Sequence, residues 1–186
     1  MGLDWIPADV PKSGCEVEFD NLRKKIAWGL PFVTSRWKKR YDEIAISPWD
    51  SLGELPLRNG EPSAFLPALP QFSHAGDYAG IDETSFRGEF VLACQDLISE
   101  QIQLRAYSPF TPSEAIDYGK ALYDRASEIA VSRGLDPASA KGDPDEDPRD
   151  SIEGQIEVFR SASEWFVFWG QKGHGIRRGR DSALLV

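Results

Sequence analysis

The residue types best suited to chemistry gather in a glycine-containing stretch over residues 73–80, Ser-His-Ala-Gly-Asp-Tyr-Ala-Gly. This stretch places an imidazole at His74, a carboxylate at Asp77 and a phenol at Tyr78, which are groups that acid–base catalysis and ligand binding use. Its glycines allow the backbone to approach a ligand closely. The alternative is a glycine turn whose polar side chains satisfy only the loop backbone.

A second candidate group lies near the C-terminal end. His174 stands between two glycines, and residues 171–186 carry a net charge of +3 in a chain whose total is -9. If the fold brings His74, Asp77 and His174 together, they could bind a metal ion or an anionic ligand. We assign no residue as a metal ligand and leave the cofactor and any catalytic group unassigned. The candidate ligand-binding residues are His74, Asp77, Tyr78, His174, Arg177 and Arg178.

Two further patterns are weaker. Asp143, Asp145 and Asp147 occupy the first three ligand positions of a calcium loop, but Pro148 stands where that loop needs glycine. We therefore expect an acidic, solvated loop between helices. Cys94 could act as a nucleophile with His74 as its base. Because both cysteines fall on apolar helix faces without basic neighbours, we expect them to act as small hydrophobic residues.

Several catalytic fingerprints are absent from the sequence. It contains no phosphate-binding glycine loop, no dinucleotide-binding glycine pattern, no nucleophile elbow and no His-Glu-x-x-His. The chain has only two histidines, so a three-histidine metal site within one chain is impossible.

Composition limits the class of protein. The 186 residues, 41% of them hydrophobic, are enough for one domain with its own core. Two cysteines and the lack of a long apolar run argue against a disulfide scaffold and a membrane span. The acidic net charge disfavours nucleic acid and anionic lipid as partners. We expect a cytoplasmic, acidic protein whose partner is a protein or a small ligand.

Helical patterns dominate and must position these residues. Ser13 and Glu16 predict a capping box for a helix that ends at Gly29 and Pro31. A second helix is predicted over 35–46, and a third over 83–107 on a broad apolar stripe.

Two longer helices complete the pattern. Thr111-Pro112-Ser113-Glu114 combines a capping box with proline at the first helical position, and it predicts a helix to Arg133. Asp150 and Glu153 predict the cap of a last helix over 150–169.

The fold class predicted is mainly α, a single-domain bundle of four to five helices spanning 1–186. A long, irregular, proline-rich excursion over 48–81 separates the second helix from the third, with a short hairpin near 55–65. We expect an acidic interhelix loop over 135–149 and a basic, flexible tail over 173–186.

The function best supported by these patterns is that of a helical binding or interaction protein. The alternative is a small metal-dependent or acid–base enzyme whose pocket lies between residues 73–83 and the C-terminal arm. A third possibility is nucleic-acid contact through Arg177, Arg178 and Arg180.

Overall fold

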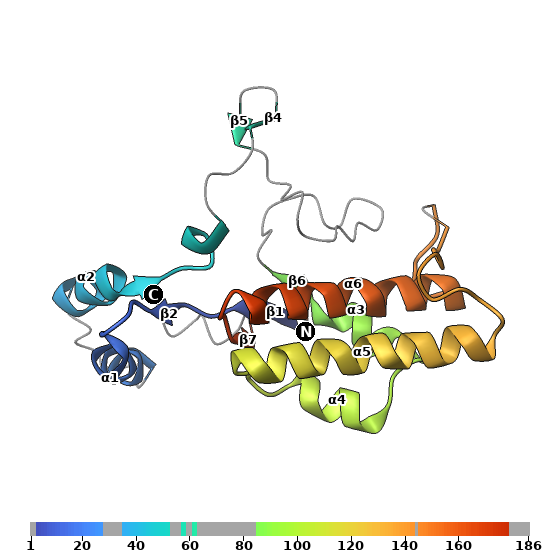
Figure 1. The fold of residues 1–186 in the computed structure, drawn as a ribbon, viewed down its shortest axis with the longest axis horizontal. Helices are drawn as coiled ribbons and strands as arrows, with labels where there is room; N and C mark the ends of the chain where they lie inside the picture. The colour runs from blue at the N-terminus through green and yellow to red at the C-terminus, as the bar shows by residue number, and fades with distance from the viewer. Residues whose placement is uncertain are drawn as a thin grey trace.

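The computed structural model describes residues 3–27, 35–52, 57–58, 61–62, 85–143 and 145–178. This part of the chain is rich in helix, as predicted, and it also contains short antiparallel strands, which the sequence analysis did not predict outside the hairpin near 55–65. It holds six α-helices instead of four to five (Figure 1). Most of the proline-rich excursion lies outside the described residues. Its described residues include β4 (Leu57–Arg58), which pairs with β5 (Glu61–Pro62).

Two long helices form the main body. α5 (Pro112–Ser132) and α6 (Ile152–Gln171) lie side by side and run antiparallel (Figure 1). Leu122 of α5 and Phe159 and Phe166 of α6 are completely buried between them and their neighbours. A side-chain carbon at Gly119 would lie only 2.8 Å from the backbone oxygen of Ser163. The absence of a side chain at Gly119 therefore lets the two helices approach closely.

Residues 83–107 do not form the single helix that the apolar stripe predicts. They contain α3 (Gly88–Ala93) and α4 (Glu100–Ala106), separated by a turn. Side chains of α5 and α6 form hydrogen bonds with backbone groups of that turn. The amide of Asp96 donates to Gln155 Oε1, and Arg125 Nε donates to the carbonyl of Leu97. Ser99 then starts α4 by accepting from the amide of Ile102. Tertiary hydrogen bonds override the helical pattern here.

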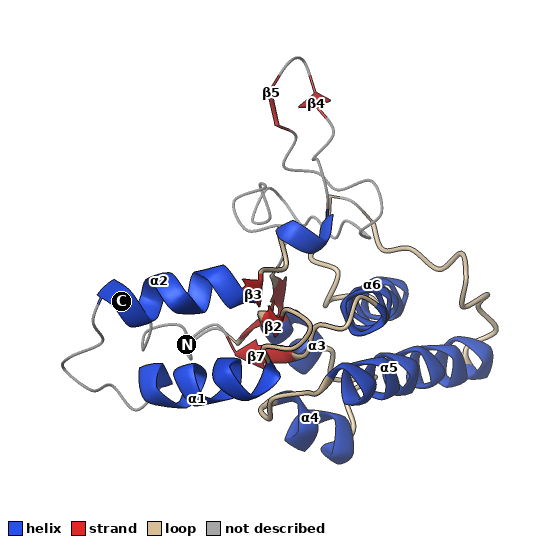
Figure 2. Ribbon diagram, turned by 60° about the vertical axis from the view of Figure 1, so that its left-hand side comes forward, coloured by secondary structure: helices blue, strands red, loops and turns tan. Residues whose placement is uncertain are grey.

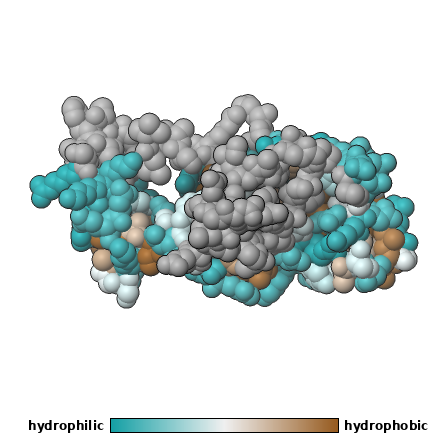
Figure 3. Space-filling model, turned by 90° about the horizontal axis from the view of Figure 1, so that it is seen from above, coloured by the Kyte–Doolittle hydropathy of each residue, from teal (hydrophilic) through white to brown (hydrophobic). Residues whose placement is uncertain are grey.

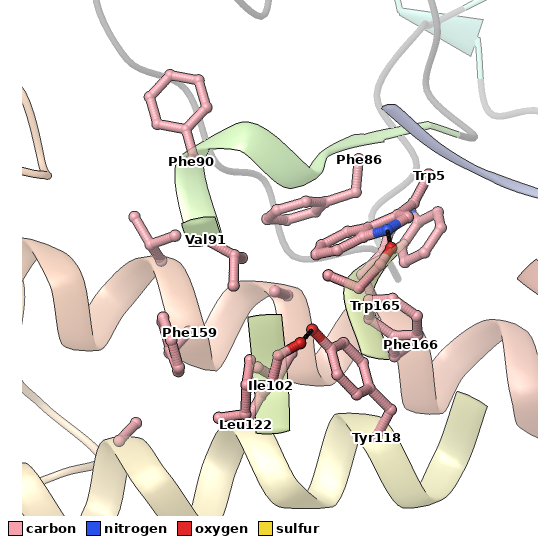
Figure 4. Packing of buried hydrophobic residues seen from close by; sticks show 14 of the residues in the cluster. Trp5, Phe86, Phe90, Val91, Ile102, Tyr118, Leu122, Phe159, Trp165 and Phe166 are labelled. Carbon is pink, nitrogen blue, oxygen red and sulfur yellow. Dashed lines mark hydrogen bonds between the residues drawn. The ribbon is translucent and has the colours of Figure 1, made fainter. Parts of the chain in front are cut away.

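The N-terminal strand β1 (Asp4–Pro7) supplies the centre of an aromatic core (Figure 4). Trp5 is completely buried, and its indole Nε1–H donates to the carbonyl of Ala106 at 2.9 Å. Its ring lies 4.9 Å from that of Phe166 and 6.1 Å from those of Phe86 and Tyr118. Edge-on and offset contacts of this kind are favourable beyond the area they bury.

β1 is also the central strand of a three-stranded antiparallel sheet. It lies between β6 (Phe86–Arg87) and β7 (Ile176–Arg178), pairing Trp5 with Phe86 on one side and with Arg178 on the other. Residues 176–178 therefore form a strand within the segment for which we expected a flexible tail. Residues 179–186 lie outside the described residues.

A helical hairpin stands apart from the main body at one end of the molecule (Figures 1 and 2). It consists of α1 (Glu16–Ala27) and α2 (Ser35–Ile44), which enclose a small apolar cluster of their own with Phe19, Leu22 and Tyr41. The strands β2 (Val10–Pro11) and β3 (Ala45–Ile46) pair at its base. The second helix is thus two residues shorter than predicted.

Helix caps test the local predictions directly. The capping box at Thr111 is confirmed, because Thr111 accepts from the amide of Glu114 and its own amide donates to the Glu114 carboxylate. The carboxylate of Glu16 reaches back as predicted, but to the amide of Gly14 instead of Ser13. α6 is capped by Ser151, which accepts from the amide of Gly154, and not by Asp150.

We expect Gly119→Ala to lower the free energy of unfolding by about 1–3 kcal/mol, because the added methyl group overpacks the contact between α5 and α6. This loss should occur although alanine favours helix over glycine by about 0.5–1 kcal/mol. Urea denaturation measures the change. The exposed Lys120→Ala on the same helix should remain within about 0.5 kcal/mol of the parent chain. Equal or higher stability of Gly119→Ala would contradict this packing.

Candidate functional site

The most distinctive surface of the described residues is a groove along the α1–α2 hairpin. Its volume is about 860 Å³, and it is lined by residues from both helices. Leu22 and Trp37 give it apolar surface, and Val17, with 77% of its surface exposed, lies on its edge. Its basic lining residues are Lys25, Arg36, Lys39 and Arg40, against the acidic residues Glu18 and Glu43.

One ion pair holds the two sides of the groove together. The guanidinium of Arg40 donates from Nε to Glu18 Oε1 at 2.8 Å and from Nη2 to Glu18 Oε2 at 2.7 Å. Its third nitrogen, Nη1, lies 3.3 Å from Glu43 Oε2. The hydrogen bonds from Arg40 lower the pKa of Glu18 and those to Glu18 and Glu43 raise the pKa of Arg40. The two-bond geometry fixes the orientation of α2 against α1.

The other cations of the groove are exposed. Lys25 Nζ stands 5.3 Å from the centre of the Trp37 ring, a cation–π contact. Arg36 and Lys39 are exposed on α2. The described surface at this end of the molecule is mostly hydrophilic with hydrophobic spots between (Figure 3). The groove thus combines exposed basic side chains with the partly buried ring of Trp37.

The sequence analysis missed this surface although its signal was present. Residues 21–41 contain seven basic residues and no acidic one. This segment carries a charge of +7, so the other 165 residues must carry -16 to give the total of -9. This charge pattern alone does not predict a groove, because the basic residues come together only when the two helices pack against each other.

His174 is completely buried at the junction of three segments. Its Nδ1 lies 2.8 Å from the carbonyl oxygen of Ala8, and its Nε2 lies 2.6 Å from Ser51 Oγ. Because a carbonyl oxygen can only accept, Nδ1 carries the hydrogen and donates it to Ala8. In the neutral imidazole Nε2 is then the acceptor, so the hydroxyl of Ser51 donates to it. Both ring nitrogens are occupied, so His174 offers none to a metal ion.

Ser51 belongs to the 3-10 helix η1 (Asp50–Leu52), which follows the hairpin. Its side chain is partly exposed. The loop before it is closed by Asp50, whose carboxylate accepts from the amide and the hydroxyl of Ser47. On the other side of the pair, Lys172 Nζ donates to the carbonyl of Ser51 at 3.2 Å, and the Trp169 ring meets the imidazole edge-on at 5.4 Å. No sequence motif indicated this pair, because Ser51 and His174 are far apart in the chain.

The predicted site residues near the C-terminus lie on β7. Arg177 lines a second cleft, of about 550 Å³, between the hairpin and the start of α5. In the same cleft the Tyr41 hydroxyl donates to Asp9 Oδ2 at 3.0 Å, and burial followed by the Asp9 charge raises the pKa of Tyr41. Arg178 pairs with Trp5 in the sheet. Ligand binding by either arginine stays a prediction.

The other predicted residues fall into two groups. His74, Asp77 and Tyr78 lie outside the described residues, so their proximity to His174 stays a prediction. Cys94 is buried, donates through Sγ to the carbonyl of Phe90, and has its pKa raised to about 12 by burial. A thiol in this state is a poor nucleophile.

The acidic loop has internal partners. Asp143 accepts from the amide of Asp145, and the Asp147 carboxylate binds the guanidinium of Arg149. Within the described ranges no three side chains of His, Cys, Asp or Glu gather in a way that could hold a metal ion. None of the helices in these ranges combines the length and the apolar character that crossing a bilayer requires.

Comparisons of the chain with models of known protein families, with curated proteins and with solved structures find no significant match. The description of this protein thus comes from its own structure, which is a helix-rich chain with a small central sheet and a basic helical hairpin.

We expect nitrogen-15 NMR of the labelled protein to show His174 with its hydrogen on Nδ1, because Ala8 can only accept a hydrogen bond. Ser51→Ala removes the donor to Nε2 and should shift the Nε2 resonance more than the Nδ1 resonance. The variant should also lose about 1–3 kcal/mol of stability, since a buried acceptor is left without a partner. A hydrogen on Nε2 in the parent protein would contradict the arrangement described above.

Proposed function

We propose that this protein is an interaction protein that binds an acidic segment of a partner protein in the groove of the α1–α2 hairpin. The observation that carries the proposal is the absence of any acidic residue between positions 21 and 41, together with seven basic ones. The hairpin brings four of the seven, Lys25, Arg36, Lys39 and Arg40, from two helices to the sides of one groove.

The dimensions of the groove suit a short peptide segment. α1 has 12 residues and is therefore about 18 Å long, which about six residues of an extended peptide can span. Lys25, Arg36 and Lys39 would face the carboxylates of that segment, and Trp37 would contact an apolar side chain between them. Arg40 is already bound to Glu18, so it keeps the groove in shape and is not expected to contribute charge to the partner.

Charge favours a protein partner over nucleic acid. A duplex presents phosphates over a long distance, so the -16 of the remaining chain would repel it beyond the hairpin. A short acidic segment can stay within the groove and avoid that repulsion. A metal-dependent enzyme that uses His174 as a ligand receives less support, because both nitrogens of His174 are engaged inside the protein.

The test is binding of a fluorescein-labelled hexaglutamate peptide, measured by fluorescence anisotropy at low and at physiological salt. We expect saturable binding that weakens as salt rises, because exposed charges are screened. The double variant Arg36→Glu and Lys39→Glu should weaken it by at least about tenfold, or about 1.4 kcal/mol. This double variant leaves the Arg40–Glu18 pair intact.

A matched control keeps the total charge change equal. Lys120→Glu and Lys141→Glu alter exposed residues outside the groove, and they should change the affinity by less than about threefold, or about 0.7 kcal/mol. Equal losses in both double variants would show that only net charge matters and would defeat the proposal. Tighter binding of a single-stranded oligonucleotide than of the peptide would also defeat it, in favour of a nucleic-acid partner.

A further inference from the structure

The buried junction of Ala8, Ser51 and His174 has the arrangement of an activated nucleophile. We propose that Ser51 and His174 form a nucleophile–base pair that cleaves small carboxylic esters. The pair lies apart from the peptide groove of the hairpin, so the proposal stands or falls separately from the binding function.

The geometry meets the requirement of such a pair at each atom. A serine hydroxyl becomes nucleophilic when an adjacent base can accept its proton and a third group holds that base in the right tautomer. The Ser51 Oγ–His174 Nε2 distance of 2.6 Å is short for a hydroxyl donor, and the carbonyl of Ala8 fixes the hydrogen on Nδ1 at 2.8 Å. The carbonyl takes the orienting role that a carboxylate has in many triads.

Ser51 and His174 differ in their exposure to solvent. His174 is completely buried, whereas Ser51 is partly exposed, so a substrate and the hydrolytic water would approach the pair from the Ser51 side. One feature of the surroundings suits a reaction that develops negative charge, because Lys172 places a cation at the Ser51 backbone.

The reaction step balances without a cofactor. Ser51 Oγ attacks the ester carbonyl carbon as its proton passes to His174 Nε2. The bond from that carbon to the alkoxy oxygen then breaks, and the departing alcohol takes the proton from Nε2. Water then gives a proton to Nε2 as its oxygen attacks the acyl carbon. The bond from that carbon to Ser51 Oγ breaks, Oγ takes the proton back from Nε2, and the carboxylic acid is released. The partial exposure of Ser51 limits the substrate to a small acyl group.

A simpler interpretation is that the pair only ties three segments of the chain together. The two interpretations differ in the reactivity of Ser51, which an organophosphorus fluoride measures on the full chain. Ser51 Oγ would attack phosphorus, fluoride would leave, and the proton would pass through His174 to solvent. We expect one modified serine, identified as Ser51 by peptide mass spectrometry.

The folded geometry should accelerate this reaction by about 10²-fold or more over the same protein unfolded in urea, as a positioned base does. Ser51→Ala should show no modification, and the exposed Ser132→Ala should be modified as fast as the parent chain. His174→Gln should slow the reaction by a similar factor, provided that circular dichroism shows it folded.

The comparison with the urea-unfolded chain keeps the test decisive even if His174→Gln does not fold. An unmodified Ser51, or a Ser51 that reacts no faster in the folded protein than in urea, would overturn the proposal. Modification of several serines at equal rates would overturn it as well. If Ser51 is modified selectively, the folded protein should also hydrolyse p-nitrophenyl acetate, and Ser51→Ala should lose that activity.

Discussion

Burial of Trp5 in the aromatic core is the interaction on which the rest of the structure depends. Its ring packs against side chains from α5, α6 and β6, and its indole nitrogen is bound by the end of α4. A side-chain carbon at Gly88 would lie 2.8 Å from the Trp5 ring, so the first residue of α3 must be small. One residue of the N-terminal strand thus sets the position of four helices.

The same strand positions the serine–histidine pair. Immediately after β1, the amide of Ala8 donates to the carbonyl of Gly175 at 2.7 Å, which carries the pairing of β1 with β7 past the end of both strands. That contact brings the Ala8 carbonyl to Nδ1 of His174. The groove of the hairpin depends on different forces, namely its own apolar cluster and the Arg40–Glu18 pair. The two candidate sites are therefore supported by separate parts of the fold.

Sequence reasoning succeeded where the structure is determined locally. Thr111 and Glu114 lie one helical turn apart, so their cap could be predicted without knowledge of any other segment. The turn between α3 and α4 could not be predicted, because the groups that interrupt the helix come from Arg125 and Gln155 on other elements. The contact of Ser51 with His174 is of the same non-local kind.

The basic groove is an intermediate case. Its charge pattern is local and visible in residues 21–41, but its meaning depends on the antiparallel packing of two helices. Figure 2 shows that hairpin projecting from the sheet. The candidate residues His74, Asp77 and Tyr78 lie outside the described residues, so their position relative to that groove stays a prediction.

The position of β1 between β6 and β7 has a consequence for synthesis on the ribosome. Trp5 leaves the ribosome 173 residues before Arg178, yet the two are paired neighbours in the sheet. Until residues 176–178 leave the exit tunnel, one edge of β1 has no strand to pair with, and His174 cannot close over Ala8. The nascent chain therefore carries an open strand edge while the residues between them are synthesised, a state that favours chaperone binding or association with other chains.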